Sequence, residues 1–276
     1  MTKYQLSLHA DRLRKGFLWR RPMAYAVVMV ENESKTLGKT EVAQPGTRAE
    51  WRKPMTLEFS SDMHVPFTVA LHDSRNDDRL MAKADFEASE VFNSRGHMQM
   101  KEDRNGTQIY ADLHEAIQGP HQGYIRLQLR GLDIKNVEPG LLGLGRSDPF
   151  FEISKKNSDH AAGIVRWNSV YRSEEICDHL NPFWEPFSIG LEELCYCNLD
   201  WPLKIAVWDY ENDGDHRVIG EVEVTAQKLI DEVAVKGNAD RERAFDLIRD
   251  GDKTKLKGVL CVLTADLTLE NEAMAA

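Results

Sequence analysis

The chain has 276 residues, 42% of them hydrophobic, and a formal net charge of -10 at pH 7. A single hydrophobic core rarely grows beyond roughly 250 to 300 residues, so this length favours two domains. No apolar run approaches the roughly 18 residues that a membrane-spanning helix needs, and the acidic balance argues against binding of nucleic acid.

Short apolar or alternating segments, bounded by Gly, Pro, Asn and Asp, recur along the chain. They predict strands at Tyr4–Leu8, Ala24–Val30, Phe67–Leu71, Tyr124–Leu129, Pro149–Ile153, Leu203–Val207 and Gly258–Leu263. This spacing favours all-β sandwiches over a helical or βαβ architecture. Helices are expected only at Ala111–Ile117 ("ADLHEAI") and Val224–Val235 ("VTAQKLIDEVAV").

The chain also contains an internal repeat. The aligned segments are Gly38–Phe59 with Val170–Ile189, and Phe67–Phe92 with Leu203–Leu229. The first pair places Trp51 opposite Trp184, at an offset of 133 residues, and we expect both rings to fill a core. The second pair places Asp73 opposite Asp209, at an offset of 136 residues. The similar offsets predict two copies of one β-sandwich.

The repeat sets the predicted domain limits, and the two domains differ in charge. We expect a diverged first domain at residues 1–117 and a second domain at residues 122–270, joined through His114–Gly123. Residues 1–118 hold 17 basic and 17 acidic residues, whereas the remainder holds 18 basic and 28 acidic residues. The whole net negative charge therefore belongs to the second half.

Three segments of the second half carry a family resemblance. They are "GRSDPFFEI" (Gly145–Ile153), "LNPFWEPF" (Leu180–Phe187) and "VWDYENDGDHRVIGE" (Val207–Glu221). These segments resemble the loop and strand motifs of a C2 domain and are most similar to the second C2 domain of the copines. The first repeat resembles a diverged copy of the first copine C2 domain. No part of the 276 residues resembles the von Willebrand factor A-like domain that copines also contain.

The resemblance implies an all-β fold of two C2-type eight-stranded antiparallel β-sandwiches in tandem, with end loops that bind calcium and phospholipid. It also implies five acidic ligand positions, at two of which the second repeat has Asp148 and Asp209. Leu142, Glu211 and Arg217 occupy the other three. Glu211 reaches further than an aspartate, and Asp213 or Asp215 could swing in from the same loop. The candidate calcium ligands are therefore Asp148, Asp209, Glu211 and Asp215.

Two alternatives to calcium stay open in the second repeat. The guanidinium group of Arg217 would form with Asp148 and Asp209 the ion pairs that calcium otherwise makes. Alternatively, the aspartates serve only turn chemistry, because carboxylates accept hydrogen bonds from nearby backbone N–H groups in tight loops.

The first repeat departs further from the calcium pattern. Aligning Pro22 with Pro149 puts Arg21 opposite Asp148, with Lys15 six residues before it. Arg75 follows Asp73 by two residues, where a further acidic ligand is implied. We therefore expect calcium as a cofactor in the second domain only.

The loop "DRLRKGFLWRRP" (Asp11–Pro22) combines basic side chains with an apolar triplet. Basic residues are attracted to anionic lipid, and aromatic rings settle at the headgroup level, so a membrane contact is expected here. The candidate membrane-binding residues are Arg14, Lys15, Phe17, Leu18, Trp19, Arg20 and Arg21, with Leu141, Leu142 and Leu144 in the second repeat. The alternative is that the apolar side chains pack on their own domain.

These patterns predict a non-enzymatic protein that binds anionic phospholipid, with the first domain independent of calcium. The four cysteines lack the spacing of a zinc site or a disulfide framework, which favours a cytoplasmic protein. We expect it on the cytosolic face of membranes, the plasma membrane above all. The alternative is a protein-interaction scaffold of degenerate C2 domains that bind neither calcium nor lipid. An enzyme is disfavoured, because no nucleophile with an oriented base can be assembled from the sequence.

Overall fold

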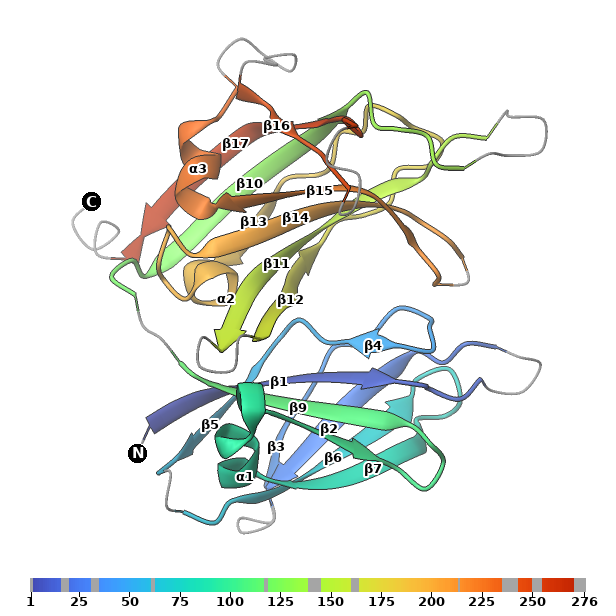
Figure 1. Ribbon diagram of the computed structural model, residues 1–276, viewed down its shortest axis with the longest axis vertical. Coiled ribbons are helices and arrows are strands. Elements are labelled where there is room, and N and C mark those ends of the chain that lie inside the picture. The colour runs from blue at the N-terminus through green and yellow to red at the C-terminus, as the bar shows by residue number, and fades with distance from the viewer. Residues whose placement is uncertain are drawn as a thin grey trace. The chain divides into compact units, whose positions relative to one another are not determined.

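The computed structural model describes residues 2–15, 20–30, 35–60, 63–116, 119–138, 145–159, 164–212, 214–234, 243–249 and 255–270. Its strands divide between two compact units, each built from two antiparallel sheets (Figure 1). Residues up to Ala116 and the segment Ser158–Val165 belong to the first unit, and the other residues from Ile117 on belong to the second. The predicted all-β fold of two antiparallel sandwiches is confirmed.

Nine strands build the described part of the first unit. They are β1 (Thr2–Asp11), β2 (Ala24–Val30), β3 (Lys35–Lys39), β4 (Ala49–Glu50), β5 (Met55–Phe59), β6 (Pro66–Asp73), β7 (Arg79–Glu87), β8 (Met98–Glu102) and β9 (Gln108–Glu115). One sheet has the order β4-β1-β9-β8, with β5 also paired to β1, and the other has the order β3-β2-β6-β7. Because β4 and β5 pair with the same strand, they act as one interrupted strand, which agrees with an eight-stranded plan.

Eight strands build the described part of the second unit. They are β10 (Gly123–Leu132), β11 (Pro149–Asp159), β12 (Ile164–Arg172), β13 (Phe187–Gly190), β14 (Pro202–Asp209), β15 (Arg217–Thr225), β16 (Phe245–Asp246) and β17 (Val259–Leu269). The sheets have the orders β13-β10-β17-β16 and β12-β11-β14-β15. Alternate side chains of β14, at Leu203, Ile205 and Val207, are fully buried between the sheets, as the period of two in a strand requires.

Each of the seven predicted strands falls on an observed one, but one predicted helix is wrong. Ala111–Ile117 was expected to be helical, whereas Gln108–Glu115 forms β9. Ile109, Ala111 and Leu113 alternate into the core, and pairing with β1 and β8 outweighs the helix preference of this short segment. The predicted linker is therefore shorter than His114–Gly123, because His114 and Glu115 belong to β9 and Gly123 begins β10.

The described helices are short. They are α1 (Ala88–Asn93), the 3-10 turn η3 (Arg95–His97), α2 (Leu191–Cys195) and α3 (Ala226–Asp231). The helix predicted within Val224–Val235 is confirmed by α3, where the Thr225 hydroxyl accepts a hydrogen bond from the Lys228 N–H at 3.1 Å. Among the residues with assigned positions, no helix has the length and apolar character to cross a bilayer.

Candidate functional site

Each sandwich gathers several loops at one end, which we call its loop end. Its described residues are 12–15, 20–23, 40–48, 51–54, 74–78 and 103–107 in the first unit, and 133–138, 145–148, 173–186, 210–212 and 214–216 in the second. The strand ladders bring these loops together. Ala24 at the start of β2 pairs with Asp73 at the end of β6, and Pro149 at the start of β11 pairs with Asp209 at the end of β14.

The aligned tryptophans hold equivalent places in the two units. The Trp51 indole N–H donates to the Ala24 carbonyl at 3.2 Å, and the Trp184 indole N–H donates to the Pro149 carbonyl at 3.3 Å. Trp51 is 5% exposed and Trp184 is 1% exposed, so the prediction that both fill a core is confirmed. Each ring ties the loop that carries it to the first residue of β2 or β11.

A hydroxyl and a carboxylate make further hydrogen bonds that occur in both units, and we call this set of equivalent hydrogen bonds the shared framework. The Thr40 hydroxyl accepts the Ala26 N–H at 2.8 Å, and the Ser173 hydroxyl accepts the Phe151 N–H at 2.9 Å. The glutamates that follow them also correspond. Glu41 accepts a backbone N–H from Arg52, and Glu174 accepts one from Glu185. The same bonds at the same positions show that the internal repeat is structural.

The aligned residues Asp73 and Asp209 also make equivalent hydrogen bonds, and these bonds correct the predicted alignment of Arg21 with Asp148. The Met23 N–H donates to Asp73 Oδ1 at 3.1 Å, and the Asp148 N–H donates to Asp209 Oδ1 at 2.8 Å. Met23 is therefore the equivalent of Asp148, and the prediction that placed Arg21 there is wrong. The two prolines are not equivalent, because Pro149 is the first residue of β11 whereas Pro22 lies two residues before β2.

Carboxylates of the second loop end accept backbone hydrogen bonds in series. The Asp178 N–H donates to Asp148 Oδ1 at 2.6 Å, and the Arg146 N–H donates to Asp178 Oδ1 at 3.0 Å. Asp209 is 1% exposed, and its Oδ2 is buried with no hydrogen-bond partner among the described residues. Burial is the main cause that raises the pKa of Asp209. Glu211 and Asp148 raise it further, while the Asp148 N–H and Arg217 act in the opposite direction.

Arg217 binds Glu211 rather than the two aspartates. Its Nε donates to Glu211 Oε1 at 2.8 Å, and a second guanidinium nitrogen contacts the same oxygen. A third nitrogen donates to the Val137 carbonyl at 3.2 Å. The direct ion pairs expected with Asp148 and Asp209 are not among the described contacts, although the charge of Arg217 acts on Asp209 through space.

Glu138 is a member of this group that sequence reasoning missed. Burial raises its pKa, as do the charges of Asp209, Asp148 and Glu211, whereas Arg217 lowers it. The charges of the other three carboxylates and of Arg217 therefore act on Glu138 through space. The sequence signal was an acidic residue just before the apolar tip, four positions earlier than the ligand position implied at Leu142.

The donor set, as the side chains stand, does not fit a calcium ion. Calcium takes roughly 6 to 8 oxygen ligands. Glu211 is engaged by Arg217, and Asp148 and Asp209 each use one oxygen for a backbone N–H. Asp215 is exposed, and no group of three or more His, Cys, Asp or Glu side chains in the described ranges is arranged to hold a metal. Within the described ranges, the buried Asp209 Oδ2 without a hydrogen-bond partner is the one observation that favours a cation.

The first loop end is basic where the second is acidic. Arg12, Arg14, Lys15 and Arg20 are exposed, and Arg21 is half-buried. Buried Leu13 anchors the start of the loop, where its N–H donates to the Thr47 carbonyl at 2.8 Å.

Two contacts tie the basic side chains to the turn between β8 and β9. Arg14 Nε donates to the Asn105 carbonyl at 2.9 Å, and a guanidinium nitrogen of Arg12 lies 3.9 Å from a Glu102 oxygen. Six predicted membrane-binding residues lie outside the described residues, and they are Phe17, Leu18, Trp19, Leu141, Leu142 and Leu144.

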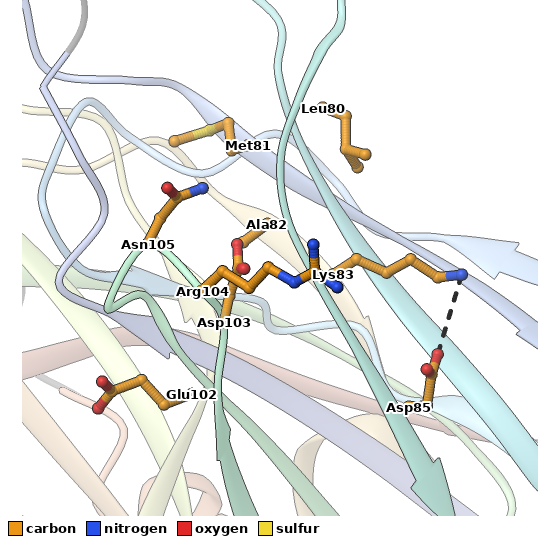
Figure 2. A pocket seen from close by; sticks show the side chains of 9 residues that line it. All are labelled: Leu80, Met81, Ala82, Lys83, Asp85, Glu102, Asp103, Arg104 and Asn105. Carbon is orange, nitrogen blue, oxygen red and sulfur yellow. Dashed lines mark ion pairs between the residues drawn. The ribbon is translucent and has the colours of Figure 1, made fainter.

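A groove of about 500 Å³ lies between β7 and the turn after β8 (Figure 2). It is lined by Leu80, Met81, Ala82, Lys83, Asp85, Glu102, Asp103, Arg104 and Asn105. Figure 2 shows the Lys83 ammonium turned toward Asp85. Lys83 Nζ lies 3.9 Å from Asp85 Oδ1, and Asp103 and Arg104 belong to the turn itself. Because both signs of charge line it, the groove selects no single class of ion.

A comparison with models of protein families agrees with this architecture. The family model of the C2 domain matches residues 7–102 and 126–241. The solved structure "BON1-C2B" is 20% identical, covers 55% of this chain and 94% of that chain, and has a TM-score of 0.43. A solved structure of the two C2 domains of Extended-Synaptotagmin 2 is 14% identical, covers 98% of this chain and 92% of that chain, and has a TM-score of 0.35.

A third solved structure is that of human GIVD cytosolic phospholipase A2. It is 13% identical, covers 95% of this chain and 32% of that chain, and has a TM-score of 0.33. The family match spans well over half of the chain, in two separate segments that fall on the two sandwiches. The chain therefore belongs to the C2 domain family and carries two C2 domains in tandem.

Proposed function

We propose that the protein is a non-enzymatic, cytoplasmic module that docks on anionic phospholipid membranes, chiefly through the loop end of its first C2 domain. In this proposal the protein resembles the C2 region of the copines, with the motifs at Gly145–Ile153 and Leu180–Phe187 as the basis for the second domain. The first domain needs no calcium, because basic side chains meet the lipid phosphates directly.

The observation that carries the proposal is the set of exposed cations around Asp11–Pro22. Arg12, Arg14, Lys15 and Arg20 all present exposed side chains at one loop end. Basic residues close to an anionic bilayer contribute about 1 kcal/mol each. The Arg12 and Glu102 side chains are 67% and 51% exposed, and such surface pairs contribute only about 0 to 1 kcal/mol, so lipid phosphate can replace Glu102.

The apolar triplet Phe17–Trp19 supplies the second half of the proposed contact. An aromatic ring gains by entering the headgroup region, and the flanking charges hold it there. In the second domain Leu141, Leu142 and Leu144 are the proposed counterpart. The acidic loop end beside them contributes no comparable attraction, so the first domain leads the docking. Two weak contacts on one chain gain by effective concentration.

Co-sedimentation with vesicles of phosphatidylserine and phosphatidylcholine, without calcium, tests the proposal. The variant Trp19→Ala, Arg20→Ala, Arg21→Ala loses two charges and the ring. Losing about 2 kcal/mol from the charges alone lowers the partition coefficient about 30-fold. The matched control, Lys3→Ala with Arg95→Ala, removes two exposed charges outside the loop end and is expected to sediment like the unmodified protein. Equal sedimentation of all three proteins would refute the proposal.

A scaffold that binds partner proteins is the second candidate. Leu80 and Met100 are 52% and 44% exposed on β7 and β8, which are edge strands of the two sheets in the first domain. Exposed apolar side chains on open edges suit pairing with another chain. This candidate gains support if the unmodified protein fails to bind anionic vesicles.

A further inference from the structure

Four acidic residues belong to the loop end of the second domain. Glu138 lies in the loop after β10, Asp148 just before β11, Asp209 at the end of β14, and Glu211 in the loop that follows. The charges of the last three all act on Glu138. Like charges in one partly buried place repel, so this arrangement needs a positive counter-charge.

Arg217 is placed to supply this positive charge. It is the first residue of β15 and pairs with Asp209 in the strand ladder, so its backbone is fixed opposite the most buried carboxylate. Its guanidinium group reaches back to Glu211 and across to the Val137 carbonyl. One side chain therefore joins the loop after β10 to the loop after β14.

We propose that the guanidinium group of Arg217 is the resident cation of this loop end and takes the place of the calcium ion that the C2 fold implies. The charge is part of the chain and requires no ion from solution. A guanidinium group keeps its proton throughout the physiological pH range. The loops after β10 and β14 are thus bridged at every calcium concentration.

The hydrogen bonds explain why calcium does not displace the arginine. An entering ion would have to take Glu211 from a guanidinium group that contacts it through two nitrogens. It would also meet Asp148 and Asp209 with one oxygen each already bound to a backbone N–H. The unpartnered Asp209 Oδ2 then remains as an acceptor that the single charge of Arg217 neutralises only through space.

Calorimetric titration of the full chain with calcium, without lipid, tests the proposal and does not depend on the proposed membrane function. The unmodified protein is expected to bind no calcium up to about 1 mM, the weak end of protein calcium sites. Arg217→Asp removes the guanidinium and adds a carboxylate, so its calcium affinity is expected to rise at least about tenfold above that limit. Without calcium, the melting temperature of Arg217→Asp is expected to be lower than that of the unmodified protein, and it is expected to recover when calcium is added.

Two further variants separate charge from position. Arg146→Asp makes the same charge change at the same loop end, where only the backbone N–H of Arg146 has a described bond to a carboxylate, and it is expected to gain no calcium binding. Arg217→Gln, of similar length and neutral, serves if Arg217→Asp does not fold, and it is expected to gain calcium binding. Calcium binding by the unmodified protein with a dissociation constant below about 1 mM would overturn the proposal. So would the absence of any gain in folded Arg217 variants.

Discussion

Replacing Asp209 by asparagine separates the two roles that a buried carboxylate can have here. Asp209 is 1% exposed, and its Oδ1 accepts the Asp148 N–H at 2.8 Å. Asparagine keeps an acceptor for that N–H and removes the negative charge. Alanine removes both, and an unsatisfied N–H costs about 1 to 3 kcal/mol. At pH 7 we therefore expect Asp209→Asn to be at least as stable as the unmodified protein and Asp209→Ala to lose about 1 to 3 kcal/mol.

The pH dependence gives the same prediction a second measurement. The pKa of Asp209 in the folded state is raised above its ordinary value of 3.8, chiefly by burial. Between the unfolded-state pKa and the folded-state pKa, the folded state therefore binds more protons than the unfolded state. The contribution of Asp209 to stability therefore falls as pH rises through the folded-state pKa. Because asparagine does not titrate, the advantage of Asp209→Asn over the unmodified protein is expected to shrink as pH is lowered from 7 toward 4.

Urea unfolding followed by tryptophan fluorescence measures both effects, since Trp184 is buried in the core of the same domain. Asp73→Asn in the first domain is the control, because Asp73 accepts the Met23 and Arg75 N–H groups through one oxygen. The reasoning is refuted if Asp209→Asn is as unstable as Asp209→Ala at pH 7. That result would mean that the fold requires the negative charge itself.

Four other substitutions test the hydrogen bonds shared by the two domains, the core and a helix cap. Thr40→Val and Ser173→Ala each leave a buried strand N–H without its acceptor and are expected to destabilise their own domains by about 1 to 3 kcal/mol, measured by urea unfolding. Burial lowers the pKa of Lys155 to about 8 from 10.5, so its contribution to stability rises with pH across that window. The unfolding free energy of the unmodified protein, compared with Lys155→Met, is expected to gain about 2 to 3 kcal/mol from pH 7 to pH 10, and no change would contradict this reading. Thr225→Ala removes the cap of α3 and is expected to lower the melting temperature of the second domain, with a loss of about 0.5 to 2 kcal/mol.

The fold could be predicted because its pattern is local and occurs twice. Alternation of apolar residues located the strands, and the Trp51/Trp184 and Asp73/Asp209 pairs located the repeat. In the structure both pairs lie where the alignment put them, because one framework of hydrogen bonds requires an indole N–H and a carboxylate at fixed places. Residues that bond to the backbone are therefore reliable markers of equivalence.

Other features could not be predicted, because tertiary pairing decides them. The helical composition of Ala111–Ile117 gave no sign of the two strands that pair with it. Pro22 looked equivalent to Pro149, but strand register follows the ladder rather than the proline. Glu138 lies outside the spacing that the resemblance implies, and only its place in the fold exposes it to the charge of Asp209. The partner of Arg217 likewise depends on loop geometry.

The shared framework makes the two domains suitable for loop transplantation. Met23 and Asp148 occupy equivalent positions in the two domains, since each donates its N–H to the aspartate that ends β6 or β14. A loop that ends at Met23 or Asp148 can therefore be exchanged between the domains, because the same N–H···carboxylate hydrogen bond is available where it joins the next strand. The basic loop of the first domain can thus be grafted onto the second domain. The graft would transfer the proposed attraction to anionic lipid while the strands of the second sandwich stay unchanged.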